Sequence, residues 1–244
     1  MRLLISLLML ALSTSAQAKT ITVAVIDTGV DTSVPKLCKS GHKNFVNSKK
    51  SLGDEHGHGT HVAGLIVKYA ENSDFCIVSL TFYSDKIEPS ESLENLSKAI
   101  QYAIDIKVDF INISGGGAEY SVLEAALIKR ALNRGIKVIV AAGNSGSDLD
   151  TKCDFFPACS DSRLVVVGNL QDVDTLTPHK KSNYGKLVNR WEVGTNVKSL
   201  APGGNVAVMS GTSQAAGIAT GKLVRDKYLK IHSYTITNLA LHKK

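Results

Sequence analysis

Short apolar runs alternate along the chain with longer segments in which apolar residues recur at every third or fourth position. The runs at 21–26, 75–80, 110–113, 136–142 and 164–167 are rich in Val and Ile, as buried strands usually are. The segments at 58–69, 92–106, 121–133 and 213–228 have the apolar spacing of helices. Apolar strands separated by helices predict a doubly wound α/β fold, with a mostly parallel sheet covered on both faces.

The pattern favours one domain, preceded by a short segment of another kind. No internal repeat, low-complexity segment or linker interrupts residues 19–244, so we expect a single domain there. Residues 1–18 combine Arg2, an apolar run at 3–12 and the sequence Ala-Gln-Ala at 16–18. These are the parts of a secretory signal peptide, which predicts cleavage near Ala18 and a secreted or periplasmic protein. The apolar run is too short to cross a bilayer and no comparable run follows, so we expect no membrane anchor.

Charge and cysteine content narrow the classes of partner and chemistry. Without Arg2, 27 Lys and Arg residues stand against 22 Asp and Glu, and they form no long basic block. This distribution is typical of a solvated surface and argues against nucleic acid as a partner. Four cysteines in an exported protein favour two disulfides, for which three pairings are open. Proximity in the sequence favours Cys153–Cys159, which leaves Cys38 to pair with Cys76.

Three polar motifs follow predicted strands or open predicted helices. Asp27 ends the run 21–26 and begins the sequence Asp-Thr-Gly, at a strand end where α/β folds build their sites. Residues 55–64 hold three histidines beside glycines, and the sequence Ser-Gly-Thr-Ser at 210–213 delivers Ser213 to the start of the last helix. A serine there lies among the unpaired N–H groups of a helix N-terminus. This position suits a nucleophile whose attack creates an oxyanion.

Taken in order, these motifs resemble the signatures of the subtilisin-like serine proteases (subtilases, peptidase family S8). The matching segments are Asp-Thr-Gly at 27–29, His-Gly-Thr-His-Val-Ala-Gly at 58–64 and Gly-Thr-Ser-Gln-Ala at 211–215. The segment 140–146 is similar to the one that supplies the oxyanion-hole asparagine in this family. A weaker match at 111–116 is similar to the strand that lines the substrate groove. The likeness covers about residues 21–224, and several motifs in the right order are far more specific than any one of them.

The resemblance implies a role for each matching residue. Ser213 would attack the scissile carbonyl, His58 would act as general base and then acid, and Asp27 would orient the imidazole. The oxyanion would be held by the side-chain amide of Asn144 and the backbone N–H of Ser213. The resemblance also makes His61 structural, and we read His56 as a solvated neighbour. The residues expected to bind the substrate backbone are Ser114, Gly115, Gly116, Ala142 and Gly143.

Three departures from the family pattern modify these expectations. Only residues 19–26 separate the predicted cleavage point from Asp27, so we expect a compact form without a pro-region, which leaves room for a separate folding helper or inhibitor. Gly217 stands where the family usually has Pro, which weakens the serine helix by up to about 1 kcal/mol relative to Ala. Residues 70–74 leave no room for the calcium loop that many relatives insert there. We therefore expect no cofactor, although family members bind calcium, because no site for it can be read.

Two rival chemistries use parts of the same motifs. Aspartic proteases also use Asp-Thr-Gly, but they need two copies, and this chain has one. Zinc hydrolases of the metallo-β-lactamase type use a similar histidine spacing, but Thr60 replaces their aspartate, and only His179 and His232 are plausible later imidazole ligands.

We therefore expect an exported monomeric serine endopeptidase that acts on polypeptides through an acyl-enzyme. Two alternatives stay open: a catalytically silent subtilase-like domain that binds peptides or proteins, and a peptide ligase or cyclase that resolves the same acyl-enzyme with an amine. The departures at the pro-region and at Gly217 motivate the silent domain.

Overall fold

The computed structural model describes residues 20–172, 174 and 176–241, and the predicted signal segment 1–18 lies outside them. Its centre is a seven-stranded sheet in the order β2-β3-β1-β4-β5-β6-β7, in which every neighbouring pair is parallel. The expected α/β fold is confirmed. The strands are β1 (Ile21–Asp27), β2 (Lys43–Asn44), β3 (Phe75–Thr81), β4 (Phe110–Ile113), β5 (Lys137–Ala141), β6 (Val165–Asn169) and β7 (Arg190–Glu192).

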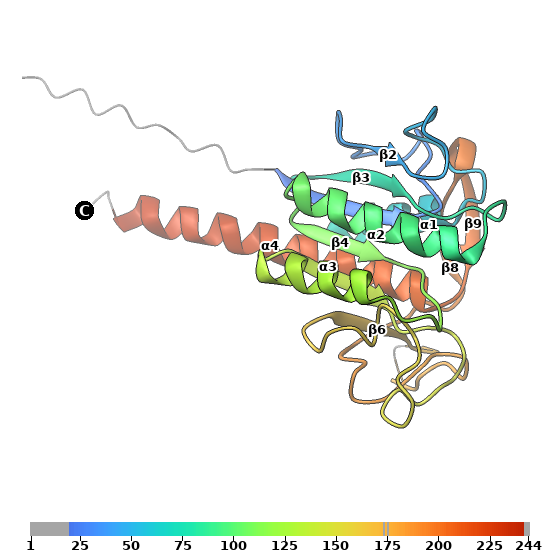
Figure 1. Cartoon of the computed structure of the whole chain (residues 1–244). Coiled ribbons are helices and arrows are strands. Elements are labelled where there is room, and N and C mark those ends of the chain that lie inside the picture. Colours follow the sequence, from blue (N-terminus) through green and yellow to red (C-terminus); the bar gives the residue numbers. More distant parts are fainter. Residues whose placement is uncertain (1–19, 173, 175, 242–244) are drawn as a thin grey trace, which may run out of the picture.

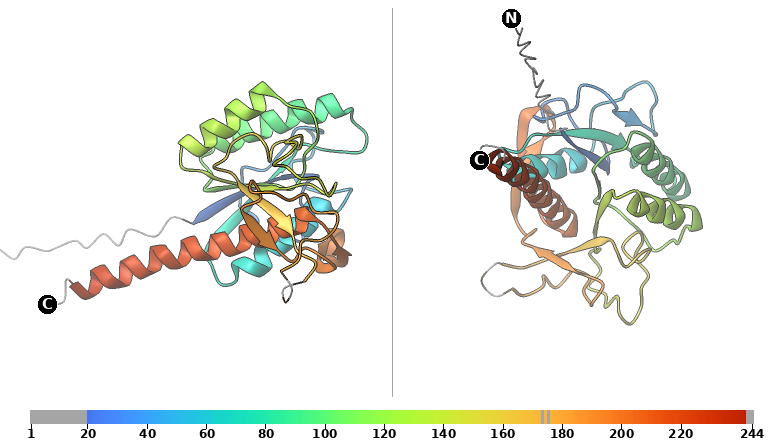
Figure 2. Two further views of the ribbon diagram at one scale, coloured as in Figure 1. Left: turned by 90° about the horizontal axis from the view of Figure 1, so that it is seen from below. Right: turned by 90° about the vertical axis from the view of Figure 1, so that its left-hand side faces the viewer.

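Four helices cover the two faces of this sheet (Figures 1 and 2). One face carries α1 (His58–Ala70) and α4 (Thr212–Leu241), and the other carries α2 (Pro89–Asp105) and α3 (Val122–Asn133). Successive residues of β1 serve opposite layers: Val23 and Val25 belong to the core under α1 and α4, and Ala24 and Ile26 to the core under α2 and α3. Because side chains alternate across a strand, a strand buried on both faces must be apolar at every position.

The structure extends the sequence-based elements in three places. Two short strands, β2 and β7, complete the edges of the sheet, and a hairpin of β8 (Val197–Ala201) and β9 (Asn205–Met209) packs beside α1. The hairpin strands carry exposed apolar residues and β7 has only three residues, so neither shows the apolar run of a buried strand. Helix α4 runs to Leu241 rather than to the expected 228, and its end projects past the sheet (Figure 1).

Gly217 lies at the contact between α1 and α4. A Cβ atom on Gly217 would lie 3.1 Å from the carbonyl oxygen of Val62, and one on Gly221 would lie 2.7 Å from that of Ile66. The missing side chains therefore let the two helix backbones approach closely. Since α1 begins at His58 and α4 at Thr212, this contact fixes the histidine and the serine helices against each other.

Two disulfides join the four cysteines, and the structure pairs Cys38 with Cys76 and Cys153 with Cys159. This is the pairing that proximity in the sequence favours. The first bond ties the loop before β2 to the strand β3, and the second closes the loop after β5. Within the described residues, no helix has the length and apolar character that a membrane span requires.

Candidate active site

Asp27 and His58 meet at the carboxyl edge of the sheet. Asp27 is the last residue of β1 and is only 3% exposed, and His58 is the first residue of α1. The Nδ1 atom of His58 lies 2.7 Å from Oδ1 of Asp27. Because a carboxylate only accepts hydrogen bonds, Nδ1 carries the proton, which leaves Nε2 free to act as a base. The negative charge of Asp27 raises the pKa of His58 above its usual 6.5, against the opposing effect of burial.

Asp54 fixes the start of α1, and the sequence analysis missed it. Gly57 before the helix has a left-handed backbone (φ 92°) and no side chain to cap it. The buried carboxylate of Asp54 takes over that role, accepting from the backbone N–H groups of Gly57 (2.8 Å) and Thr60 (2.9 Å). It also accepts from the hydroxyls of Thr28 and Thr60. An acidic residue just before a predicted helix is the signal that could have revealed it.

Ser213 lies in the first turn of α4 and is 9% exposed. Its hydroxyl donates to the carbonyl oxygen of Ser114 at 2.7 Å. The pairing of Ile26 with Ile113 brings Asp27 and Ser114 out of neighbouring strands at the same edge. The three expected catalytic residues therefore converge on one end of the sheet. Among the hydrogen bonds of the described residues, however, the Ser213 hydroxyl pairs with Ser114 and not with His58.

A chain of buried polar side chains anchors the Ser213 helix to β4. The hydroxyl of Ser114 has two acceptors for its one proton, Oδ1 of Asn112 (2.9 Å) and the carbonyl oxygen of Ser213 (3.2 Å). The amide of Asn112, which is fully buried, donates to the hydroxyl of Thr220, about two helical turns beyond Ser213 in α4. Since unpaired buried polar groups are costly, these bonds fix the position of α4 along β4. Sequence reasoning assigned neither Asn112 nor Thr220 a role.

Asn144 contacts the first residue of the Ser213 helix through its side-chain amide. Its Oδ1 atom accepts from the backbone N–H of Thr212 (3.0 Å) and from the Thr212 hydroxyl (3.2 Å). A backbone N–H can only donate, so the atom facing it is the oxygen, and the Nδ2 group remains free to donate elsewhere. The residue is exposed and directly adjoins the turn that precedes Ser213. This geometry suits a hydrogen-bond donor for an oxyanion.

Phe155 fills the space between the two segments that were expected to bind the substrate backbone. Cβ atoms placed on Gly116 and on Gly143 would both lie within about 3.0 Å of its ring. The following residue, Phe156, exchanges two backbone hydrogen bonds with Gly117. The ring of Phe155 therefore lies against both Gly116 and Gly143.

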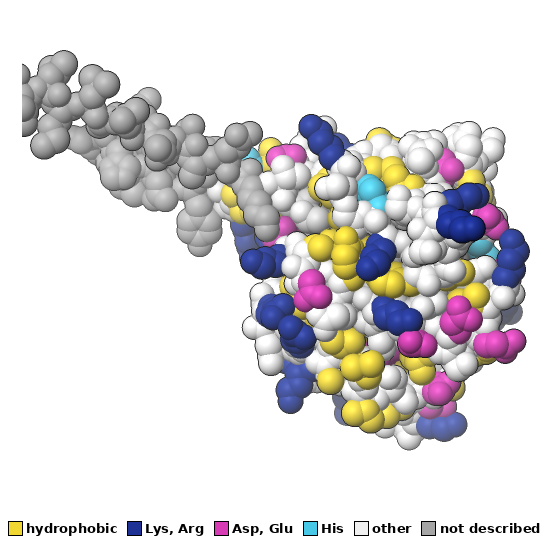
Figure 3. All heavy atoms as spheres, turned by 45° about the horizontal axis from the view of Figure 1, so that its top comes forward, with side chains coloured by type: hydrophobic (Ala, Val, Ile, Leu, Met, Phe, Trp, Pro, Cys, Tyr) yellow, Lys and Arg dark blue, Asp and Glu magenta, His cyan; other side chains and the backbone are white. Residues whose placement is uncertain are grey.

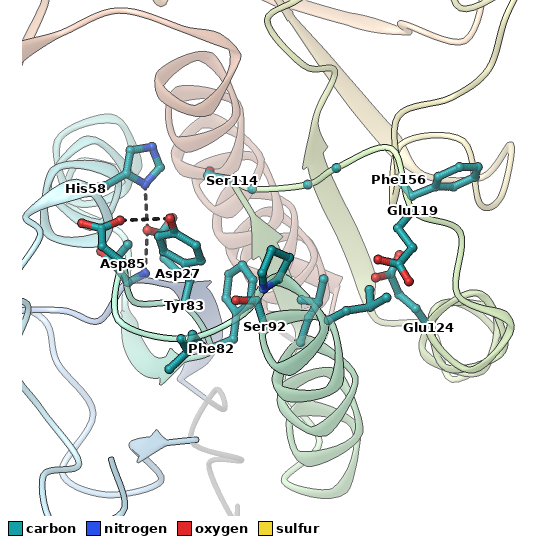
Figure 4. A pocket seen from close by; sticks show the side chains of 18 of the residues that line it. Asp27, His58, Phe82, Tyr83, Asp85, Ser92, Ser114, Glu119, Glu124 and Phe156 are labelled. Carbon is teal, nitrogen blue, oxygen red and sulfur yellow. Dashed lines mark hydrogen bonds and ion pairs between the residues drawn. The ribbon is translucent and has the colours of Figure 1, made fainter. Parts of the chain in front are cut away.

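A cleft of about 720 Å³ extends from His58 along the residues after β4. Figure 4 shows Asp27 and His58 at one end, Ser114 near the middle, and Glu119, Glu124 and Phe156 at the other end. On the face drawn in Figure 3, basic and acidic side chains alternate without a large patch of one sign. The volume of the cleft is typical of ligand-binding sites, and the cleft includes the Asp27–His58 pair in its lining.

The other two histidines of the motif differ from His58 in their surroundings. His61 is fully buried, and its Nε2 atom lies 3.1 Å from the carbonyl oxygen of Val197 and 3.2 Å from that of Ala207, in the β8–β9 hairpin. Burial lowers the pKa of His61, so it stays neutral and donates to these carbonyls. His56 is exposed, with its ring centre 6.2 Å from that of His58. Nowhere in the described ranges do three or more His, Cys, Asp or Glu residues gather in a group suited to a metal ion.

Comparisons with known proteins identify the relatives of the chain. The model of the subtilase family matches residues 18–244. The major intracellular serine protease of Bacillus subtilis is 33% identical over 232 residues, which cover 89% of this chain and 72% of that protein. Subtilisin NAT of Bacillus subtilis subsp. natto is 33% identical over 207 residues, and there the chain spans only 53% of the relative's length.

Solved structures give the same result for the fold. A lanthipeptide protease superposes with a TM-score of 0.73 at 25% identity, covering 84% of this chain and 72% of its own. A cold-adapted subtilisin-like serine proteinase superposes with a TM-score of 0.68 at 28% identity, covering 82% of this chain and 72% of its own.

Proposed function

The chain belongs to the subtilase family of serine-type peptidases, and from that premise we propose that it is an exported endopeptidase that forms an acyl-enzyme on Ser213. The observation that carries this proposal is the 2.7 Å hydrogen bond between His58 and Asp27 at the edge where Ser213 begins its helix. Polypeptides are the substrates that membership of a peptidase family implies. Residues 19–244 would form one peptidase domain that acts as a monomer after removal of residues 1–18.

In the proposed reaction, Ser213 first turns from the Ser114 carbonyl towards Nε2 of His58. The hydroxyl oxygen then attacks the scissile carbonyl while His58 takes its proton, and Asp27 stabilises the imidazolium that forms. His58 passes the proton to the departing amine, which breaks the peptide bond and leaves the acyl-enzyme. A water molecule then attacks the acyl carbon while His58 takes its proton. His58 returns this proton to the Ser213 oxygen as the acyl bond breaks, which releases the acid and restores the hydroxyl.

Asn144 and the backbone N–H of Ser213 would stabilise the negative charge on the carbonyl oxygen during both steps. The Nδ2 group of Asn144 and the N–H groups of the helix N-terminus would supply these donors before the charge develops. The binding of Oδ1 to Thr212 holds the amide in this orientation, so little reorganisation is needed at the moment of reaction.

Labelling with a fluorophosphonate tests this function directly. We expect the folded protein to become labelled on Ser213 and to cleave unstructured peptides, and Ser213→Ala to lose both properties. Ser210→Ala is the matched control, because Ser210 is an exposed serine three residues earlier whose hydroxyl contacts Asn196. A protein that is folded by circular dichroism but is neither labelled nor able to cleave any peptide would refute the proposal.

A catalytically silent peptide-binding domain is the second candidate. It is favoured by one observation, the donation of the Ser213 hydroxyl to Ser114 rather than to His58. Such a domain would bind peptides equally well before and after the Ser213→Ala substitution and would leave them intact. Mass spectrometry of the products also separates hydrolysis from ligation, because a ligase would join added amines to the acyl fragment.

A further inference from the structure

Glu124 is a buried carboxyl group without a partner at the far end of the active-site cleft. It lies in the first turn of α3, its side chain is part of the cleft lining, and the residue is 1% exposed. Its Oε1 atom is buried and has no hydrogen-bond partner in the part of the chain that the structure describes. Among the described residues, no ion pair includes Glu124. Burial away from water raises its pKa to about 7, because the ionised form loses its hydration.

The local sequence offers Glu124 a structural role that it does not take. Ser121 and Glu124 have the spacing of a capping box, in which the serine caps the helix and the glutamate bonds back to the serine N–H. The first half forms, since the backbone N–H of Glu124 donates to the Ser121 hydroxyl at 3.2 Å. The second half is not among the hydrogen bonds of the described residues, and the carboxyl group lines the cleft instead. Helix capping therefore does not account for this side chain.

The surroundings of Glu124 favour a positively charged ligand with an apolar stem. The described residues that line the cleft include the further acids Asp85 and Glu119 but no Lys or Arg. Both acids are exposed, so they can attract a cation without holding it. Apolar side chains, among them those of Leu93 and Leu96, form part of the walls of the same cleft. The methylene groups of a lysine or arginine would pack along these walls while the charged end reached the carboxylate.

We propose that Glu124 selects peptides that carry a lysine or arginine side chain at a position removed from the cleaved bond. The position is removed because Glu124 and His58 lie at opposite ends of the cleft (Figure 4). The cation would supply the missing partner of a carboxylate that is already buried in the free protein, and the attraction between the two charges is stronger away from water. This inference rests on the proposed function, since it assigns the cleft to a peptide substrate.

Peptide binding to the Ser213→Ala protein tests the inference without requiring catalysis. In a flexible peptide of neutral residues, one position at a time carries either lysine or norleucine, which has the same stem without the ammonium group. Dissociation constants are measured by fluorescence anisotropy. We expect one position at which the lysine peptide binds about ten- to a hundredfold more tightly than its norleucine partner. Adding Glu124→Gln, which keeps the shape of the side chain, should bring the two affinities together.

Glu91→Gln is the matched control for net charge. Glu91 is exposed on the neighbouring helix α2 and does not line the cleft, so its loss should leave the preference for lysine unchanged. Equal binding of lysine and norleucine at every position would overturn the inference, as would a lysine preference that survives Glu124→Gln or a protein that binds neither peptide. A wild-type protein that binds lysine peptides selectively but cleaves none would instead refute only the proposed hydrolysis.

Discussion

Replacement of Asp54 by alanine tests whether one carboxylate holds the start of the His58 helix. Asp54 accepts five hydrogen bonds: from the backbone N–H groups of His56, Gly57 and Thr60, and from the hydroxyls of Thr28 and Thr60. The Thr28 hydroxyl in turn accepts from the backbone N–H of the residue after His58. The substitution therefore leaves several donors unpaired at the one helix end that carries the proposed base.

The expected loss of stability follows from these contacts. Removal of a helix N-cap costs about 1–2 kcal/mol. Each of the two hydroxyls that lose a charged acceptor adds about 1 kcal/mol. The total of about 3–4 kcal/mol corresponds to a fall in Tm of about 10 °C for a domain of this size. We also expect a marked fall in kcat/KM at temperatures where the variant is folded, because His58 is the first residue of the loosened helix.

Thermal unfolding followed by circular dichroism measures the effect, with Asp54→Asn as the matched variant. Asparagine keeps one carbonyl oxygen in place, so Asp54→Asn should lower Tm less than Asp54→Ala. As a control, Asp85→Ala removes an exposed carboxylate from the cleft beside His58, and it should leave Tm nearly unchanged. If Asp54→Ala unfolds within about 2 °C of the wild type, the reasoning that assigns the helix start to Asp54 is wrong.

Three further predictions concern the reaction itself. Because Asp27 raises the pKa of His58 above 6.5 and the base must be neutral, kcat/KM should rise with pH through an apparent pKa above 6.5. Asp27→Asn should move this rise to lower pH. A pH–rate profile in which the variant shows the rise at the same pH as the wild type would contradict this. Asn144→Ala should lower kcat by about 10²–10³ with little change in KM, a magnitude known from subtilisin rather than worked out from this chain; steady-state kinetics that show a loss in KM alone would contradict the oxyanion role. Phe155→Ala should empty the space beside Gly116 and Gly143. Two peptide substrates, one with a large and one with a small side chain beside the cleaved bond, are then compared, and the variant should raise kcat/KM for the large one relative to the small one. An unchanged ratio of the two kcat/KM values would show that the ring does not limit the pocket.

The fold could be predicted because its signals are local. The apolar runs at 21–26 and 110–113 form strands that are buried on both faces, and a short run of this kind fits few other structures. The convergence of the site followed from the same topology, since Asp27 ends one strand and His58 opens a helix at the same edge of the sheet. The short strand β7 and the β8–β9 hairpin were not predicted, because their residues show no such apolar pattern.

The side-chain partners within the site could not be predicted, because they join residues that are far apart in the chain. The hydroxyl of Ser213 meets the carbonyl oxygen of Ser114 across 99 positions. Asn112 reaches Thr220 across 108 positions. The ring of Phe155 was flagged only as one that could narrow a pocket, and its contact with Gly116 depends on how the loop after β5 folds back. No local rule of spacing encodes contacts of this length.

Glu124 departs from the capping-box pattern that its spacing from Ser121 predicts, and this departure is informative. The spacing of Ser121 and Glu124 is typical of a capping box, and a sequence-based account would treat the glutamate as explained by it. The structure forms only the serine half and buries the carboxyl group in the lining of a cleft that contains the proposed base. A buried carboxyl group without a hydrogen-bond partner destabilises the free protein. Costs of this kind are expected at binding sites rather than in residues that only support the fold. The unpaired Glu124 carboxyl is therefore better explained by a cationic ligand that completes it than by the stability of α3.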